Sequence, residues 1–136
     1  MKKEIRILYV EDLPADAVLV THELRRASLQ FRLKRVDSRQ AFDRELARHP
    51  PDLILSDHGL PCFDGLSALA LAKQKCPDVP FIFVTNSRGE RVAIERFECG
   101  ATDYVLKSNL PKLVPAVKRA LREAGERAKI REQEQA

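Results

Sequence analysis

Short apolar runs alternate with longer segments of helical periodicity along the chain, and this alternation limits the fold more than any other feature. Strands that alternate with helices favour a parallel sheet with helices on both faces. Because crossovers between parallel strands are right-handed, few strand orders are open, and we predict an α/β fold with the order 2-1-3-4-5. The predicted strands are Ile5–Val10, Phe31–Val36, Leu53–Ser56, Phe81–Thr85 and Asp103–Leu106.

Proline, glycine and small polar residues mark the ends of the predicted helices. Pro14 suits a first helical turn, Asp37 or Ser38 suits an N-cap, and Gly100 suits a C-terminal cap. Gln40 stands three residues after Asp37, as in a capping box. The predicted helices cover about residues 14–27, 38–48, 65–75 and 89–99, and a last helix begins near Pro111.

Polar side chains follow four of the predicted strands at the point where each strand ends. Glu11 and Asp12 follow the first strand, and Asp57, Thr85 and Lys107 stand at the ends of the third, fourth and fifth. The carboxyl ends of parallel strands converge on one crevice in an open α/β sheet. Since neighbouring carboxylates repel and an ammonium needs an anion, a divalent metal together with a phosphoryl group would satisfy this set.

The composition is that of one globular domain, with 136 residues, 44% of them hydrophobic and 32% charged. No apolar segment reaches the roughly 20 residues that span a bilayer, and no signal peptide is evident, so we expect a cytoplasmic protein. The cysteines, Cys62, Cys76 and Cys99, lack metal-ligand spacing and are expected to be reduced. The net charge of +4 comes without any nucleic-acid-binding signature, so we expect the basic residues on solvated helix faces.

The last predicted helix changes character near Ala124. Apolar residues recur at helical spacing up to that point, whereas residues 127–136 are nearly all polar. An isolated polar helix is marginally stable in water. We therefore expect one domain over residues 1–125 and a polar helical extension over residues 126–136, which frays, pairs with a second copy or leads to a further domain.

Four motifs stand at the predicted strand ends in a fixed order. They are the acidic pair Glu11-Asp12, the run Asp57-His58-Gly59-Leu60-Pro61-Cys62-Phe63-Asp64-Gly65, the single residue Thr85, and the run Gly100-Ala101-Thr102-Asp103-Tyr104-Val105-Leu106-Lys107. Through these motifs the chain resembles the receiver domains of bacterial two-component response regulators, over about residues 3–125. The resemblance implies a flavodoxin-like fold and a role in phosphorelay signal transduction.

The resemblance also implies roles for the acidic residues. Asp57 corresponds to the nucleophile that accepts a phosphoryl group from a phosphohistidine on a partner kinase or phosphotransfer protein. Asp12, Asp57 and the backbone carbonyl of Gly59 correspond to direct ligands of Mg²⁺, and Glu11 corresponds to a ligand that acts through a bound water. The chain would then be no enzyme for other substrates, catalysing only its own phosphorylation and dephosphorylation.

Three further residues correspond to positions that respond to the phosphorylated aspartate in this family. Lys107 matches the cation that pairs with a phosphoryl oxygen, and Thr85 matches the hydroxyl that binds another. Tyr104 matches an aromatic switch residue whose ring turns inward as the threonine moves. The family uses the surface over residues 89–124 to contact protein effectors and to form dimers. The sequence identifies neither the kinase nor the effector.

Residues beside the site depart from the family pattern. Ser108 follows Lys107 where proline is usual, often after a cis peptide bond, so we expect a trans bond with a shifted loop or a strained cis bond. Asn86 stands where the family usually has a small residue. Gly59 and Ser87 offer no acid or large amide to orient an attacking water, which predicts slow loss of the phosphoryl group.

Other functions fit these residues less well. A phosphohydrolase would need a carboxylate two residues after Asp57, where Gly59 stands. A flavodoxin-like cofactor binder would need a glycine-rich phosphate loop in place of the acidic pair. Two readings stay open beside the phosphorylated receiver: a receiver that binds partners without phosphorylation, and the N-terminal receiver of a larger regulator or hybrid histidine kinase.

Overall fold

The computed structural model describes residues 4–57, 65–85 and 100–135, and these form one parallel sheet flanked by helices. The sheet has the order β2-β1-β3-β4-β5. Its strands are β1 (Ile5–Val10), β2 (Phe31–Val36), β3 (Leu53–Ser56), β4 (Phe81–Thr85) and β5 (Asp103–Leu106). The predicted flavodoxin-like α/β fold and strand order are therefore confirmed.

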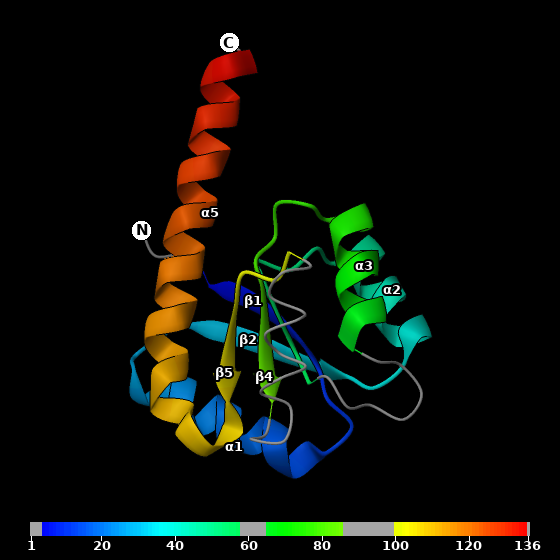
Figure 1. The fold of residues 1–136 in the computed structure, drawn as a ribbon, viewed down its shortest axis with the longest axis vertical. Helices are drawn as coiled ribbons and strands as arrows, with labels where there is room; N and C mark the ends of the chain where they lie inside the picture. Colours follow the sequence, from blue (N-terminus) through cyan, green and yellow to red (C-terminus); the bar gives the residue numbers. More distant parts are fainter. Residues whose placement is uncertain (1–3, 58–64, 86–99, 136) are drawn as a thin grey trace.

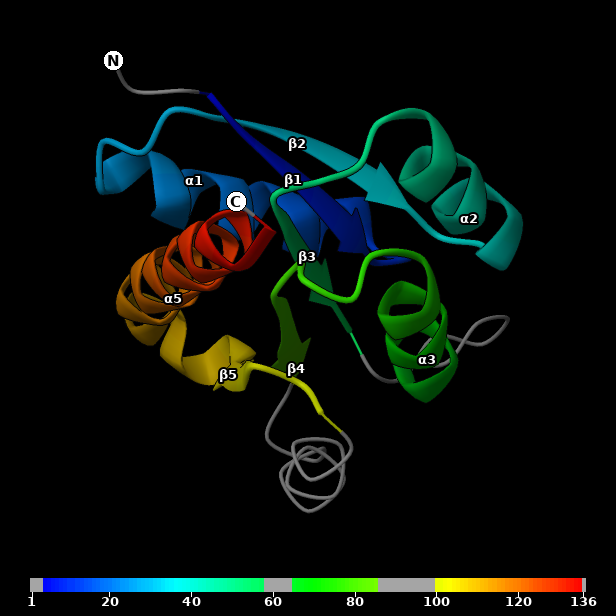
Figure 2. The ribbon, with the colours of Figure 1, turned by 90° about the horizontal axis from the view of Figure 1, so that it is seen from above.

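Helices cover both faces of this sheet (Figures 1 and 2). They are α1 (Pro14–Arg26), α2 (Arg39–Arg48), α3 (Gly65–Lys75), the 3₁₀ helix η2 (Lys107–Lys112) and α5 (Leu113–Gln135). Helices α1 and α5 pack on one face, where Val20, Leu24 and Val117 are buried. Helices α2 and α3 pack on the other, where Phe42 and Leu69 are buried. Helices α1, α2, α3 and α5 thus each bury an apolar stripe against the sheet, as amphipathic helices do.

The start of α2 differs from the capping-box prediction. Ser38 is the N-cap, and its side chain accepts a hydrogen bond of 3.1 Å from the Ala41 backbone N–H. Ala41 therefore occupies the third helical position, and the expected capping box between Asp37 and Gln40 is wrong. The hydroxyl of Ser38 reaches the free N–H groups of the first turn, which is what stabilises a helix start.

The last helix, α5, begins at Leu113, close to the predicted start near Pro111. The short helix η2, which was not predicted, precedes it from Lys107. The described residues contain no cis peptide bond, so the Lys107–Ser108 bond is trans, the first of the two forms expected. The helix predicted over residues 89–99 lies outside the described residues.

Helix α5 continues well beyond the sheet, as Figure 1 shows. Residues 125–134 are all exposed. Arg131 forms an ion pair with Asp78, in the turn between α3 and β4. No helix among the described residues is both long enough and apolar enough to cross a membrane.

The ladder between β1 and its neighbours sets the positions of the acidic residues. Val10 pairs with Ser56 across β1 and β3. The Asp57 N–H donates to the Val10 carbonyl at 2.9 Å, and the Glu11 N–H donates to the Val36 carbonyl at 2.9 Å. Glu11 and Asp57 therefore leave the sheet at the same level, at its carboxyl edge.

Candidate functional site

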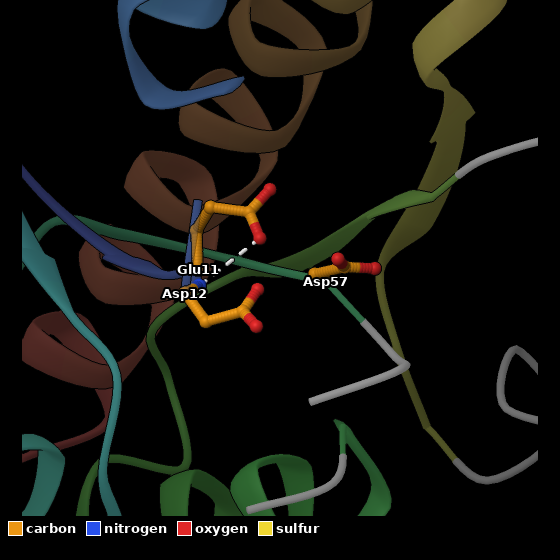
Figure 3. A group of neighbouring side chains, drawn as sticks. All are labelled: Glu11, Asp12 and Asp57. Atoms are coloured by element: carbon orange, nitrogen blue, oxygen red, sulfur yellow. Dashed lines mark hydrogen bonds between the residues drawn. The ribbon is translucent and has the colours of Figure 1, made fainter. Parts of the chain in front are cut away.

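Three carboxylates gather at the carboxyl edge of the sheet. Glu11 and Asp12 follow β1, and Asp57 follows β3 (Figure 3). Each of the three offers one oxygen, and these oxygens all lie within 4.8 Å of one another. The Asp12 backbone N–H donates to Glu11 Oε2 at 3.1 Å, which fixes the orientation of the Glu11 carboxylate. Carboxylate oxygens this close are suited to a hard divalent cation such as Mg²⁺.

The ammonium group of Lys107 lies beside two of these carboxylates. Lys107 Nζ is 2.7 Å from Glu11 Oε1 and 3.1 Å from Asp57 Oδ2. It is also 2.7 Å from Asp16 Oδ2. An ammonium group has three donors, so these three acceptors use its full hydrogen-bonding capacity. We call Glu11, Asp12 and Asp57 the acidic group. The structure thus brings Lys107 together with the acidic group, as the convergence of strand ends predicts.

Asp16 is a member of this site that the sequence reasoning missed. It lies in the first turn of α1, and its side chain is 26% exposed. The available signal was its place in the first turn of the helix that begins directly after the acidic pair. Because a strand end and the following helix start lie at the same edge of the sheet, an acid there can reach the crevice.

Burial controls the protonation of Glu11. This residue is fully buried, and burial raises the pKa of its carboxyl from 4.5 to about 7. The hydrogen bond from Lys107 opposes this rise in pKa, and the charge of Asp57 adds to it. The Tyr9 hydroxyl donates to Glu11 Oε1 at 3.4 Å, and burial together with the Glu11 charge raises the pKa of Tyr9. Tyr9 therefore stays a protonated donor, while Glu11 exchanges its proton near neutral pH.

The charges of the site favour a cation. Burial by itself would lower the pKa of Lys107, but the hydrogen bonds to Asp16 and Glu11 and the charge of Asp57 raise it overall. Lys107 is therefore an ammonium at all physiological pH values. The Lys107 ammonium contacts three carboxylates, those of Glu11, Asp16 and Asp57. Mutual repulsion among ionised carboxylates in this group would be reduced by a bound metal. The donor set of this edge thus fits Mg²⁺.

Thr85 and Tyr104 lie on β4 and β5, two of the strands that end at this edge of the sheet. Thr85 is the last residue of β4, is fully buried and pairs in register with Leu106, directly before Lys107. Tyr104 pairs with Phe83 and is half-buried against the core beneath α2 and α3. Thr85 thus lies at the carboxyl edge. Of the other predicted positions, Gly59, His58, Asn86 and Ser87 lie outside the described residues.

Comparison with known proteins identifies the family. Residues 7–118 match the model of the response regulator receiver domain. The chain belongs to this family. The resemblance inferred from the four motifs is therefore confirmed.

Curated relatives of this receiver domain are parts of longer proteins. The chain is 38% identical to the regulatory protein LuxO of Vibrio cholerae over 80 residues, which is 58% of the chain and 18% of LuxO. It is 36% identical to the transcriptional regulatory protein BaeR of Escherichia coli over 131 residues, which is 95% of the chain and 53% of BaeR. The chain thus spans about half or less of the length of these relatives.

Solved structures of receiver domains have the same fold. A putative response regulator from Chloroflexus aurantiacus superposes with a TM-score of 0.78 at 27% identity, over 88% of this chain and 98% of that one. The receiver domain of a sensor histidine kinase from Pseudomonas aeruginosa superposes with a TM-score of 0.74 at 27% identity, with the same two coverages. The latter structure has a magnesium ion coordinated in its active site cleft.

Proposed function

We propose that this receiver domain accepts a phosphoryl group on Asp57 from a phosphohistidine of a partner kinase or phosphotransfer protein. The observation that carries the proposal is the Lys107 ammonium, 3.1 Å from the Asp57 carboxylate at an edge crowded with other carboxylates. A carboxylate nucleophile needs no base to deprotonate it. One Asp57 oxygen forms a bond to phosphorus while the bond from phosphorus to the histidine nitrogen breaks. The electron pair of that bond stays on the nitrogen.

The acidic group supplies the oxygen ligands for Mg²⁺ in this proposal. Asp12 and Asp57 would bind it directly with the Gly59 carbonyl, and Glu11 would hold one of its waters. When bound, the metal supplies positive charge that stabilises the transferring phosphoryl group. The separation of at most 4.8 Å between the oxygens of the three side chains supports this assignment.

The remaining residues act on the phosphorylated form. Lys107 donates to a phosphoryl oxygen, which its raised pKa supports because the ammonium never loses its charge near neutral pH. Thr85, at the end of β4, donates a hydrogen bond from its hydroxyl to another phosphoryl oxygen. The movement of Thr85 changes the packing of Tyr104 and so the surface over residues 89–124, where a protein effector or a second copy binds.

The proposal also places a domain boundary in α5, between residues 125 and 126. The receiver covers residues 1–125, and the polar segment over residues 126–136, in which α5 continues to Gln135, is a linker toward a further segment or partner. Its exposure beyond the sheet supports this assignment. Phosphorylation of Asp57 would then change the contact between this receiver domain and the segment or partner that the linker leads to.

Phosphoryl uptake from a small donor tests the proposal. The wild-type protein is incubated with Mg²⁺ and acetyl phosphate, and its intact mass is compared with that of Asp57→Ala. Asp78→Ala is a matched control, since Asp78 lies in the turn between α3 and β4, before the amino end of β4. We expect a gain of one phosphoryl group in the wild type and Asp78→Ala but not in Asp57→Ala. No gain in the wild type would favour a receiver that works without phosphorylation.

A further inference from the structure

The three acceptors of the Lys107 ammonium differ in what they do during phosphoryl transfer. Glu11 and Asp57 belong to the group of carboxylates suited to a metal, whereas Asp16 does not. Asp57 is also the group that reacts under the proposed function. Asp16 is therefore the one acceptor of the three with neither of these tasks, and its oxygen is as close to Lys107 Nζ as that of Glu11, at 2.7 Å.

We infer that Asp16 is a positioning residue that keeps the Lys107 ammonium aimed at the phosphoryl group on Asp57. This role rests on the proposed function. When the Asp57 oxygen forms its bond to phosphorus, the Lys107 donor now directed at Asp57 must turn to a phosphoryl oxygen. Asp16 can hold another Lys107 donor before and after this change, because nothing in the transfer alters Asp16 itself.

The position of Asp16 is fixed by the packing of α1. Its backbone N–H donates to the Leu13 carbonyl at 3.1 Å, closing the first turn of α1. Ala17, Val20 and Leu24 bury the same helix against the sheet. A carboxylate in the first turn is also favoured by the helix dipole. Asp16 is thus held in place by a packed helix, and Lys107 reaches it from a position 91 residues later in the chain.

A simple ion pair that stabilises the fold is the competing account. The Lys107 and Asp16 side chains are 19% and 26% exposed, so the pair is only partly buried. Partly exposed pairs often contribute little to stability. The two accounts differ in what they predict for the reaction: positioning changes the binding of a phosphoryl mimic, whereas a purely structural pair changes only unfolding.

Asp16→Asn, which keeps the size of the side chain, tests this role. Beryllofluoride, a mimic of the phosphoryl group, is titrated with Mg²⁺ present, and phosphorylation by acetyl phosphate is timed. We expect both the affinity for beryllofluoride and the rate to fall about tenfold, as for loss of one charge-assisted hydrogen bond. Asp16→Glu should recover part of the loss. Glu23→Gln, on the same helix and paired with Arg26, should match the wild type.

A second readout follows Lys107 directly. The ¹H–¹⁵N signal of its ammonium, visible when the group is held by acceptors and exchanges slowly, should weaken or vanish in Asp16→Asn but not in Glu23→Gln. Wild-type affinity and rate in Asp16→Asn, even with lower stability, would overturn the role of Asp16 and leave the proposed function standing. A wild-type protein that takes up no phosphoryl group would overturn both.

Discussion

Lys107 and Glu11 are 96 residues apart in the sequence, yet Lys107 Nζ lies 2.7 Å from Glu11 Oε1. Glu11 follows β1 and Lys107 follows β5, and β3 and β4 lie between these two strands in the sheet. The ion pair therefore reaches across the carboxyl edge over two intervening strands. Because Glu11 is fully buried, this pair connects the packing of the core to the electrostatics of the site.

Removing the ammonium should destabilise the domain. In Lys107→Met the aliphatic stem remains, but the carboxylates lose their cation, and loss of one partner of a buried pair costs roughly 3–5 kcal/mol. Since Lys107 is 19% exposed, we expect about 2–3 kcal/mol less unfolding free energy in urea at pH 8 without metal. Mg²⁺ should restore part of this loss. The exposed Lys112→Met is the control, and an equal effect there would contradict the account.

The buried Glu11 carboxyl should make stability depend on pH. Its pKa in the folded protein is about 7, above its ordinary value of 4.5. Its contribution to the free energy of unfolding is therefore complete below pH 4.5 and is lost as pH rises through 7. Without metal, we expect the free energy of unfolding to fall by an amount of order 3 kcal/mol over this range. Urea unfolding at several pH values measures this loss, and Glu11→Gln should remove it. An identical pH dependence in wild type and Glu11→Gln would show that another group is responsible.

The same proton should compete with metal binding. A cation at the acidic group favours the ionised form of Glu11, so the protein must release a proton to bind Mg²⁺ below pH 7. We expect the affinity for Mg²⁺ to be about tenfold lower at pH 6 than at pH 8. Calorimetric titration in two buffers of different ionisation enthalpy would measure the proton release. Binding without any released proton at pH 6 would argue against this coupling.

The strands could be predicted closely because each is an apolar run of the right length between breakers. Both faces of the central strands are covered by helices, so their residues are apolar without alternation, as in the buried β3. The acidic group and Lys107 could be predicted because parallel strands bring their carboxyl ends together. Phosphorylation at Asp57 and the roles of Thr85 and Tyr104 stay predictions.

Other features depend on contacts that the local sequence does not reveal. Asp16 joins the site through a contact between the first turn of α1 and Lys107, which lies 91 residues later in the chain. The helix η2 contains Asn109 in a non-helical conformation, with φ −138° and ψ 51°, which separates it from a regular α-helix. Ser38 and Asp37 are both residue types that favour an N-cap, and the structure uses Ser38.

The exposed end of α5 should be dispensable for folding. A chain that ends at Gly125 keeps the sheet and the buried faces of the helices but loses residues 126–136 and the ion pair between Arg131 and Asp78. Because the pair is exposed, we expect the unfolding free energy to change by less than about 1 kcal/mol. Urea denaturation of the two chains measures this. A large loss of stability would show that the extension is part of the domain.

The central claim is that Asp57 carries the phosphoryl group, and locating that group is its most direct test. The protein is phosphorylated with acetyl phosphate and Mg²⁺ and then reduced with borohydride, which converts an aspartyl phosphate to homoserine. Peptide mapping by mass spectrometry then reads the modified position. The account predicts homoserine at position 57 in the wild type and at no position in Asp57→Ala. Homoserine at position 12, or at no position in the wild type, would contradict it.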